Sequence, residues 1–260
     1  MGLFDLTAPL FSLLDSLLFN LPDLVKLIIW GLLAGYGSMW LFKRFSDQGK
    51  IQIIKQQVKN NQKKMAEFEG EMAELLPLVG QTLKLAFKQL GAALGPALLV
   101  SIPVIFLLAW ISNHYGLIQP VADEPYLAEV QVADGVNFDP GIYNWENTAS
   151  ARFGSDDQAW EFNWPKNGLD LRLKQGETNI LNISSDSISP LVHKRQWWNW
   201  LIGNPMGYLP ADSEIDQLMF NFRQKKIIEV GPSWMHGWMF TFFMSFLVFS
   251  LAFKFILKIA

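Results

Sequence analysis

The chain has 260 residues, of which 50% are hydrophobic, and a formal net charge of −3. Its mean hydropathy of +0.17 is too high for an ordinary soluble domain and too low for a chain that lies wholly inside a membrane. The absence of cysteine excludes disulfides, thiol chemistry and cysteine-ligated zinc. No Walker loop, nucleophile elbow, HExxH or dinucleotide fingerprint occurs, so we expect no catalytic residues, no cofactor and no metal.

Residues 1–22 predict an amphipathic helix that lies in the membrane interface. Asp5 and Asp15 lie off a wide apolar stripe, which is made by Leu10, Phe11, Leu13, Leu14, Leu17 and Leu18. Pro22 then predicts a bend before the chain crosses the bilayer. The alternative is a short additional span that forms a hairpin with the next one, which the two carboxylates disfavour.

Three apolar segments are each close to the ~20 residues that cross the ~30 Å hydrocarbon core of a bilayer. They predict three transmembrane helices, over residues 23–44, 93–112 and 233–260. In the first, the GxxxG spacing of Gly31 and Gly35 favours close approach of another helix, from within the chain or from a partner. In the second, Pro96 and Pro103 predict either a kink beside a cavity or an irregularity of packing.

The charges between these spans predict the orientation of the chain. Residues 43–90 hold nine Lys or Arg and five Asp or Glu, whereas residues 112–233 hold nine and sixteen. Basic loops stay in the cytoplasm and long acidic domains can be translocated. We therefore expect a multi-pass protein of the cell (inner) membrane, with its N-terminus and residues 112–233 outside and its C-terminus in the cytoplasm.

The basic segment, residues 45–92, predicts a cytosolic coiled-coil hairpin. Its seam follows the 3-4-3-4 spacing of such structures, at Ile51, Ile54, Val58, Asn61, Met65, Phe68, Met72 and Leu75. Because the chain must return to the membrane, we expect the hairpin to turn either within residues 57–62 or near Gly70. The alternative is a solvated amphipathic helix without a partner.

Residues 113–232 predict a β-rich extracytoplasmic domain, which at about 120 residues is long enough to have its own core. Polar and apolar residues alternate in short runs separated by turn-forming residues, over 126–132, 158–164, 169–173 and 179–183. Interface aromatics, or a platform against the membrane surface, are predicted at Trp197, Trp198, Trp200 and Tyr208. The predicted fold class is an α-helical membrane protein with an added β-rich domain.

Polar residues of the spans are candidates for a groove that holds segments of a substrate. Lys43 and Arg44, at the end of the first span, are either a stop-transfer anchor or charges in this groove. The hydroxyl groups that could line the groove belong to Ser38, Ser101, Thr241, Ser245 and Ser250. Each hydroxyl could instead be satisfied by the backbone of its own helix.

Four stretches of the chain carry a family resemblance. They are the N-terminal helix with the first span (residues 3–45), the coil (48–89), the proline-bearing LGPALLVSIPVIFLLAWI (94–111) and PSWMHGWMFTFFMSFLVFSLAFKFILKI (232–259). Together they resemble the YidC/Oxa insertase superfamily. The resemblance is closest to its three-span branch, which includes archaeal YidC-like proteins and a subunit of the eukaryotic ER membrane complex.

The resemblance implies that three core spans form a groove open to the cytosol and to lipid, and that the coil hairpin helps to capture substrates. Insertases of the bacterial type keep a basic residue in this groove, on the first core span. Lys43 and Arg44 are the nearest candidates, at the end of the span rather than in its middle. The external domain is a departure from three-span relatives, and it suggests a docking site for an extracytoplasmic partner or for the translocated part of a client.

We expect a membrane-protein insertase or intramembrane chaperone that inserts client helices without covalent chemistry. Its partners would be nascent membrane polypeptides, the lipid bilayer, a ribosome or targeting factor at the basic coil, and an extracytoplasmic protein, with no other nucleic-acid binding. One alternative is a structural or sensory subunit whose external domain binds a partner or ligand. Another is an enzyme that acts on lipid or envelope polymer through that domain.

Overall fold

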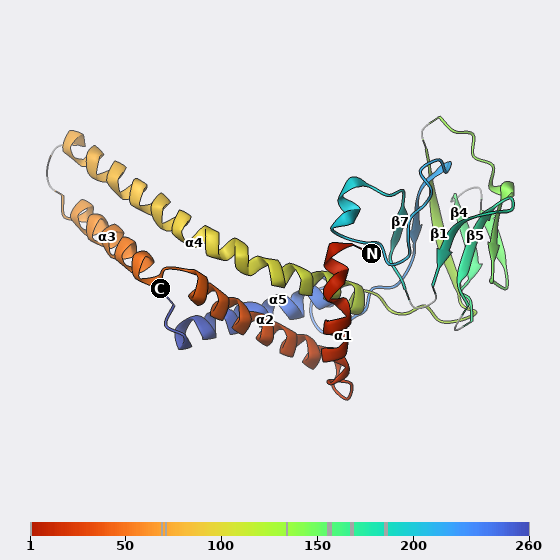
Figure 1. Ribbon diagram of the computed structural model, residues 1–260, viewed down its shortest axis with the longest axis horizontal. Helices are drawn as coiled ribbons and strands as arrows, with labels where there is room; N and C mark the ends of the chain where they lie inside the picture. The colour runs from red at the N-terminus through yellow and green to blue at the C-terminus, as the bar shows by residue number, and fades with distance from the viewer. Residues whose placement is uncertain are drawn as a thin grey trace. The chain divides into compact units, whose positions relative to one another are not determined.

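The computed structural model (Figure 1) describes residues 2–68, 70, 72–133, 135–154, 158–166, 169–184 and 187–259, without the side chains of residues 72–74. The chain divides into two compact units. The strand unit comprises Met1–Asp23 and Phe106–Met239, and the helical unit comprises Leu24–Ile105 and Phe240–Ala260.

Three helices are long and apolar enough to cross a membrane, as the sequence predicts. They are α2 (Asp23–Phe45), the part Leu75–Tyr115 of α4 (Met72–Tyr115), and α5 (Trp238–Ile256). The helix α4 runs without a break through the predicted boundary between coil and span at residue 92, and it holds Pro77, Pro96 and Pro103 in its interior. Membrane helices tolerate such prolines because neighbouring groups satisfy the freed carbonyls.

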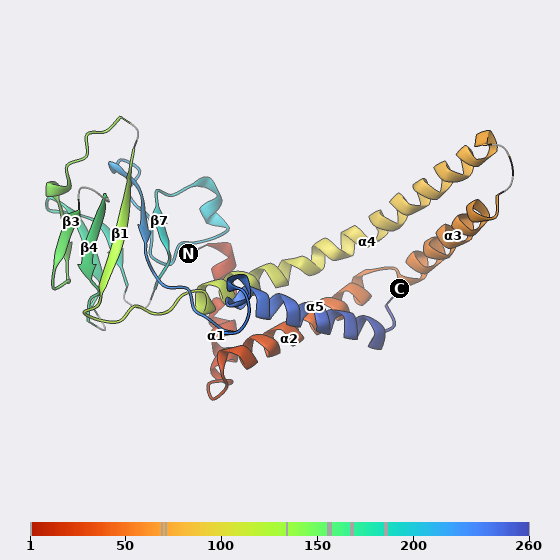
Figure 2. The same cartoon turned by 180° about the vertical axis from the view of Figure 1, so that it is seen from behind.

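The helical unit also contains α3 (Gln48–Ala66), whose N-terminus is capped by Asp47, with Oδ1 3.0 Å from the backbone nitrogen of Lys50. Since α3 continues through residues 57–62, the prediction of a turn there is wrong. The connection lies instead between Ala66 and Met72, around the second predicted position, Gly70. Figures 1 and 2 show α3 and α4 running side by side from this connection.

The helix α3 packs with the face that the heptad spacing predicts. Of the seam residues, the structure buries Ile51, Ile54 and Asn61 and half-buries Val58, Met65 and Phe68, whereas the intervening residues from 52 to 67 are exposed. Thr82 Oγ1 of α4 lies 3.5 Å from Sδ of Met65, so the two helices are in contact. The seam position Met72 lies outside the described side chains.

Two antiparallel sheets form the β-rich part of the strand unit. Their strand orders are β3-β4-β1-β8-β7 and β2-β5-β6. The strands are β1 (Pro125–Val132), β2 (Tyr143–Glu146), β3 (Ala151–Gly154), β4 (Ala159–Asn163), β5 (Leu171–Gln175), β6 (Thr178–Ile183), β7 (Leu191–His193) and β8 (Ile215–Phe220). The four runs of alternating residues in the sequence correspond to β1, β4, β5 and β6.

The core of this unit lies on the inner faces of the strands. Ala128 of β1 pairs with Trp160 of β4 on one side and with Phe220 of β8 on the other, and all three side chains are buried. Trp145 stacks on Phe162 with ring centroids 5.0 Å apart. Because side chains alternate between the two faces of a strand, buried residues alternate with more exposed ones along β1, β2 and β5.

The N-terminal elements η1 (Leu3–Thr7) and α1 (Ala8–Ser16) pack along the last turns of α4, within the strand unit. The contacts keep the same order along both segments: Phe4 with Phe106, Phe11 with Trp110, and Asp15 with Tyr115. The N-terminal segment and the end of α4 therefore run side by side.

Candidate functional site

The helices α2 and α5 touch at the predicted glycines. A Cβ added to Gly31 would lie 2.5 Å from Cβ of Ser245, and one added to Gly35 would lie 3.0 Å from the backbone nitrogen of Ser250. Any side chain at these positions would push the helices apart. The prediction of a close helix contact is confirmed, and it lies within the chain.

The predicted groove hydroxyls divide into two kinds. Ser38 and Thr241 are buried, at 5% and 4% exposed, and their hydroxyl groups have no hydrogen-bond partner among the residues that the structure describes. Ser245 Oγ donates to the carbonyl of Thr241 at 2.7 Å, and Ser101 Oγ donates to the carbonyl of Leu98 at 2.7 Å. The prediction that a hydroxyl bonds to the backbone of its own helix is therefore right for Ser101 and Ser245 and wrong for Ser38 and Thr241.

A buried hydroxyl without a partner costs about 1–3 kcal/mol relative to one that is hydrogen-bonded. Ser38 and Thr241, on α2 and α5, therefore favour a polar partner inside the helical unit, such as water or a polar group of a bound segment. Ser250, 9% exposed and likewise without a partner in the described part of the chain, adds a third such group on α5.

The basic pair at the end of α2 has two different environments. Lys43 Nζ donates to the carbonyl of Leu257 at 2.9 Å, just beyond the last residue of α5, while the neighbouring Arg44 is exposed. A cation at the C-terminus of a helix satisfies a terminal carbonyl and interacts favourably with the helix dipole. Lys43 thus caps α5, a role that the sequence did not indicate.

One face of α4 is an apolar surface that the sequence analysis missed. It contains Leu76, Val79, Leu83, Phe87, Leu90, Leu94 and Leu98, which are between 39% and 65% exposed. These residues recur every three or four positions, so they form one stripe on the helix, which we call the α4 stripe. The first five precede the predicted span over residues 93–112, and Leu94 and Leu98 lie within it. The sequence pattern did not reveal the stripe because the predicted coiled-coil seam ends at Leu75, just before its first residue.

A buried carboxylate was also missed, in the strand unit. Asp15 is 4% exposed, accepts a hydrogen bond from the Tyr115 hydroxyl at 2.6 Å, and lies 3.5 Å from Nε2 of His114. Nearby, Trp110 Nε1 donates to Ser12 Oγ at 2.9 Å. The polar face of α1 is thus turned toward α4, and its leucines face away from the protein. The signals in the sequence were the carboxylate of Asp15 within an apolar helix and the Asn-His-Tyr run at the end of a span.

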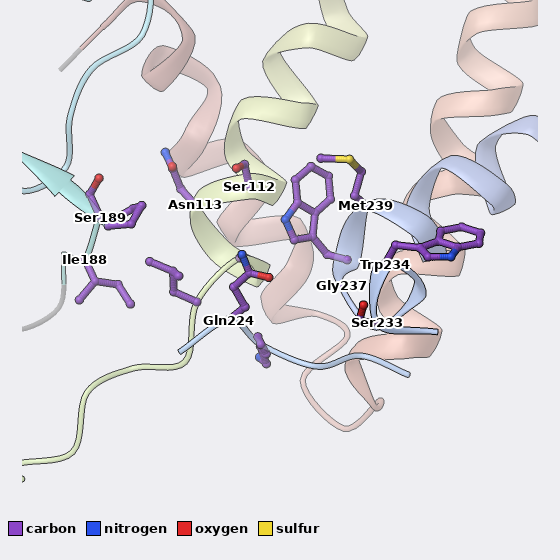
Figure 3. A pocket seen from close by; sticks show the side chains of 14 residues that line it. Ser112, Asn113, Ile188, Ser189, Gln224, Ser233, Trp234, Gly237 and Met239 are labelled. Atoms are coloured by element: carbon purple, nitrogen blue, oxygen red, sulfur yellow. The ribbon is translucent and has the colours of Figure 1, made fainter. Parts of the chain in front are cut away.

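A cavity of about 380 Å³ lies in the strand unit, where α4 ends and α5 begins (Figure 3). Its walls come from the end of α4, the segment before β7, the segment after β8 and the start of α5, and they carry Ser112, Asn113, Ser189, Gln224, Ser233 and Trp234. Lys225 also lines it, but its Nζ pairs with Asp23 Oδ2 at 2.6 Å. The cavity has the size of a small-molecule site and offers neutral hydrogen-bonding groups.

No group of three or more His, Asp or Glu able to hold a metal ion occurs in the part of the chain that the structure describes. No family model, no curated protein and no solved structure matches this chain. The resemblance to the YidC/Oxa superfamily remains a prediction from the sequence motifs.

Proposed function

We propose that this chain is a membrane-protein insertase or intramembrane chaperone of the YidC/Oxa type. In this proposal α2, α4 and α5 cross the membrane, α3 and the start of α4 form the cytosolic coiled-coil hairpin, and the β-rich part of the strand unit lies outside. Client helices enter from the cytosol and leave into lipid. The partners are nascent membrane polypeptides and the bilayer, with a ribosome or targeting factor at the basic hairpin.

The observation that carries the proposal is the α4 stripe. From Leu76 to Leu94 it extends ~27 Å along the helix at 1.5 Å per residue, and with Leu94 and Leu98 it enters the predicted span. An exposed apolar surface of this kind is unfavourable in water and marks a binding site for apolar partners. The stripe gives a client helix a continuous apolar path from the hairpin to the bilayer.

The flanks of the stripe and the interior of the helical unit suit the same client. Lys84 and Lys88 are exposed beside the stripe and keep this part of α4 in the aqueous phase. The unsatisfied hydroxyls of Ser38 and Thr241 would offer hydrogen bonds to polar groups of a client, whose transfer into lipid otherwise costs several kcal/mol per group.

Reconstituted insertion assays test this proposal. The double variant Leu83→Gln/Phe87→Gln makes the middle of the stripe polar, and we expect it to insert several-fold fewer client helices. The matched control is Ile53→Gln, since Ile53 is 60% exposed on α3 and lies off the seam. Equal insertion by the double variant, the control and the natural chain would refute the role of the stripe.

Crosslinking in cells identifies what the stripe binds. A photoreactive residue at Phe87 or Ser101 should capture many different nascent membrane proteins, while the same probe at Ile53 should not. Capture of a single stable protein from the stripe would contradict the insertase proposal.

The cavity favours a second candidate, a structural or sensory subunit whose external domain binds a ligand or partner. Gly237 offers a probe, because a Cβ added there meets nothing within 4 Å. Gly237→Trp would partly fill the cavity. If it abolishes function in cells while client insertion in vitro is intact, the sensory reading is favoured; if neither changes, the cavity has no role in function.

A further inference from the structure

The segment Trp197–Ile202 of the strand unit carries an unusual set of exposed aromatics. Trp197 is 81% exposed, Trp200 56% and Ile202 50%. By contrast, the tryptophans in the strands or directly after one are all buried, at 5% or less: Trp145, Trp160 and Trp164. Among the described residues from the start of β1 to the end of β8, the exposed aromatic side chains all lie in this segment, which contains η3 (Trp197–Trp200). Elsewhere in the strand unit, Phe19 and Trp234 are also exposed, at 74% and 69%.

The exposed conformation is held from inside by a buried side chain. Asn199 is 2% exposed; its Oδ1 accepts from the backbone nitrogen of Gln196 at 2.7 Å, and its Nδ2 donates to the carbonyl of Ile202 at 3.2 Å. With both ends of the segment tied to Asn199, the side chains on either side of it point outward. The exposure of Trp197 and Trp200 is thus built into the segment.

This segment is attached to the N-terminal elements. The backbone nitrogen of Phe4 donates to the carbonyl of Leu201 at 3.0 Å. Gly2 lies so close that an added Cβ would be 2.6 Å from the same carbonyl. The exposed tryptophans therefore adjoin η1, which leads directly into α1. The outward side chains of η1, of α1 and of the residue after α1 are Leu6, Leu10, Leu13 and Leu17, between 55% and 72% exposed.

The contacts of Phe4 also indicate where the segment Trp197–Ile202 lies relative to the apolar part of α4. The ring of Phe4 packs against that of Phe106 with centroids 5.0 Å apart. Phe106 lies inside the apolar run of α4, about six residues or ~9 Å of helix before the next polar residue, Ser112. Phe4, whose backbone nitrogen bonds to Leu201, thus packs against the apolar part of α4, and the segment lies near the level at which α4 leaves the apolar region.

We infer that the β-rich part of the strand unit is anchored in lipid by Trp197, Trp200 and Ile202. The tryptophans occupy the boundary between headgroups and acyl chains, where the indole ring places its apolar body in lipid and its N–H among polar groups. With the leucines of η1 and α1 they form one lipid-facing surface. The inference rests on the membrane topology of the proposed function but requires no insertase activity.

The absence of cysteine makes a direct test possible with single labels. The full chain carrying Ile202→Cys is labelled with an environment-sensitive fluorophore and placed, one copy per nanodisc, in phosphatidylcholine with brominated acyl chains. Labels at Leu98→Cys and Ile142→Cys serve as references, since Leu98 is 65% exposed on α4 and Ile142 is 39% exposed in the β-rich part. Ile202→Cys leaves all three tryptophans of the segment in place.

We expect bromine to quench the label at residue 202 as it quenches the label at 98, and to leave the label at 142 unquenched. Adding Trp197→Ser and Trp200→Ser should remove the quenching at 202. An unquenched label at 202 beside a quenched label at 98 would overturn the anchor and leave the topology intact. An unquenched label at 98 would overturn the topology and the anchor together, and quenching at 202 that survives the double tryptophan variant would overturn the role of the tryptophans.

Discussion

The strand unit and the helical unit bury their apolar side chains in opposite ways. In the strand unit Trp160, Phe162 and Leu171 are 3%, 0% and 0% exposed, and aromatic rings fill the core. In the membrane-length helices α2 and α5, only 33% and 17% of the most apolar window is buried inside the protein. The first pattern is that of a core stabilised by removing apolar side chains from water. The second leaves apolar surface exposed, which suits lipid, because lipid is as apolar as leucine and gives no hydrophobic drive to helix association.

This difference predicts where each unit derives its stability. The strand unit should depend on the volume of its core side chains, and the helical unit on close backbone contact at a few small residues. The following variants test the two halves of the comparison.

The largest effect should come from Phe162→Ala. It removes a fully buried ring that stacks on Trp145, and such truncations cost about 3–5 kcal/mol because a cavity remains. Denaturant unfolding of the full chain in detergent, followed by the near-UV signal of the aromatics, measures the loss. The control Leu127→Ala, on β1 with a side chain 38% exposed, should cost much less. Equal losses would show that the core does not carry the stability of this unit.

Gly31→Val tests the helical unit. The new side chain would collide with Ser245, and overpacking of this kind costs about 1–3 kcal/mol. Gly37→Val is the matched control, because a Cβ added to Gly37 of the same helix meets nothing within 4 Å. Thermal unfolding in detergent should show a lower midpoint for the first variant only. If both midpoints fall equally, the effect comes from the glycine-to-valine change itself and not from the α2–α5 contact.

A pH-dependent loss of stability should be confined to the strand unit. Burial raises the pKa of Tyr143 to about 12, and the carboxylate of Glu214, 3.2 Å from its hydroxyl, contributes further. In the unfolded chain the pKa of Tyr143 is about 10. Between about pH 10 and about pH 12 the folded unit therefore binds more protons than the unfolded chain. The contribution of the neutral hydroxyl is complete below about pH 10 and is lost as the pH rises through about 12.

Denaturant midpoints at about pH 9 and about pH 11, on either side of the unfolded pKa, measure this loss. Tyr143→Phe cannot ionise and should fall less between the two conditions than the natural chain. An identical fall in both proteins would show that Tyr143 is not the responsible group.

The smallest effect on stability should come from the basic pair of α2. Lys43→Gln removes a cation from the C-terminus of α5 and should cost about 0.3–1 kcal/mol, whereas Arg44→Gln should leave stability unchanged. Replacing both should reduce client insertion without unfolding the protein. Insertion at the natural level by the double variant would reject a groove charge and leave Lys43 as a cap of α5.

Several elements were predictable because they repeat along the chain. The four alternating runs became β1, β4, β5 and β6, and the heptad spacing identified the packed face of α3. The site was predictable only in part. Ser38 and Thr241 were candidates from composition, but burial without a partner depends on how α2 and α5 meet, and no local pattern encodes that.

The sequence by itself determined which segments are apolar, which alternate and which are charged, because each of these is a property of neighbouring residues. Only the tertiary structure decided that Asp15 is buried against Tyr115, that Lys43 caps α5, and that the segment of Trp197 and Trp200 adjoins η1. In each case the decisive partner lies about a hundred residues or more away, as for Tyr115, Leu257 and Leu201. Such contacts depend on how whole helices and strands pack against one another. The propensity of a single segment does not determine them.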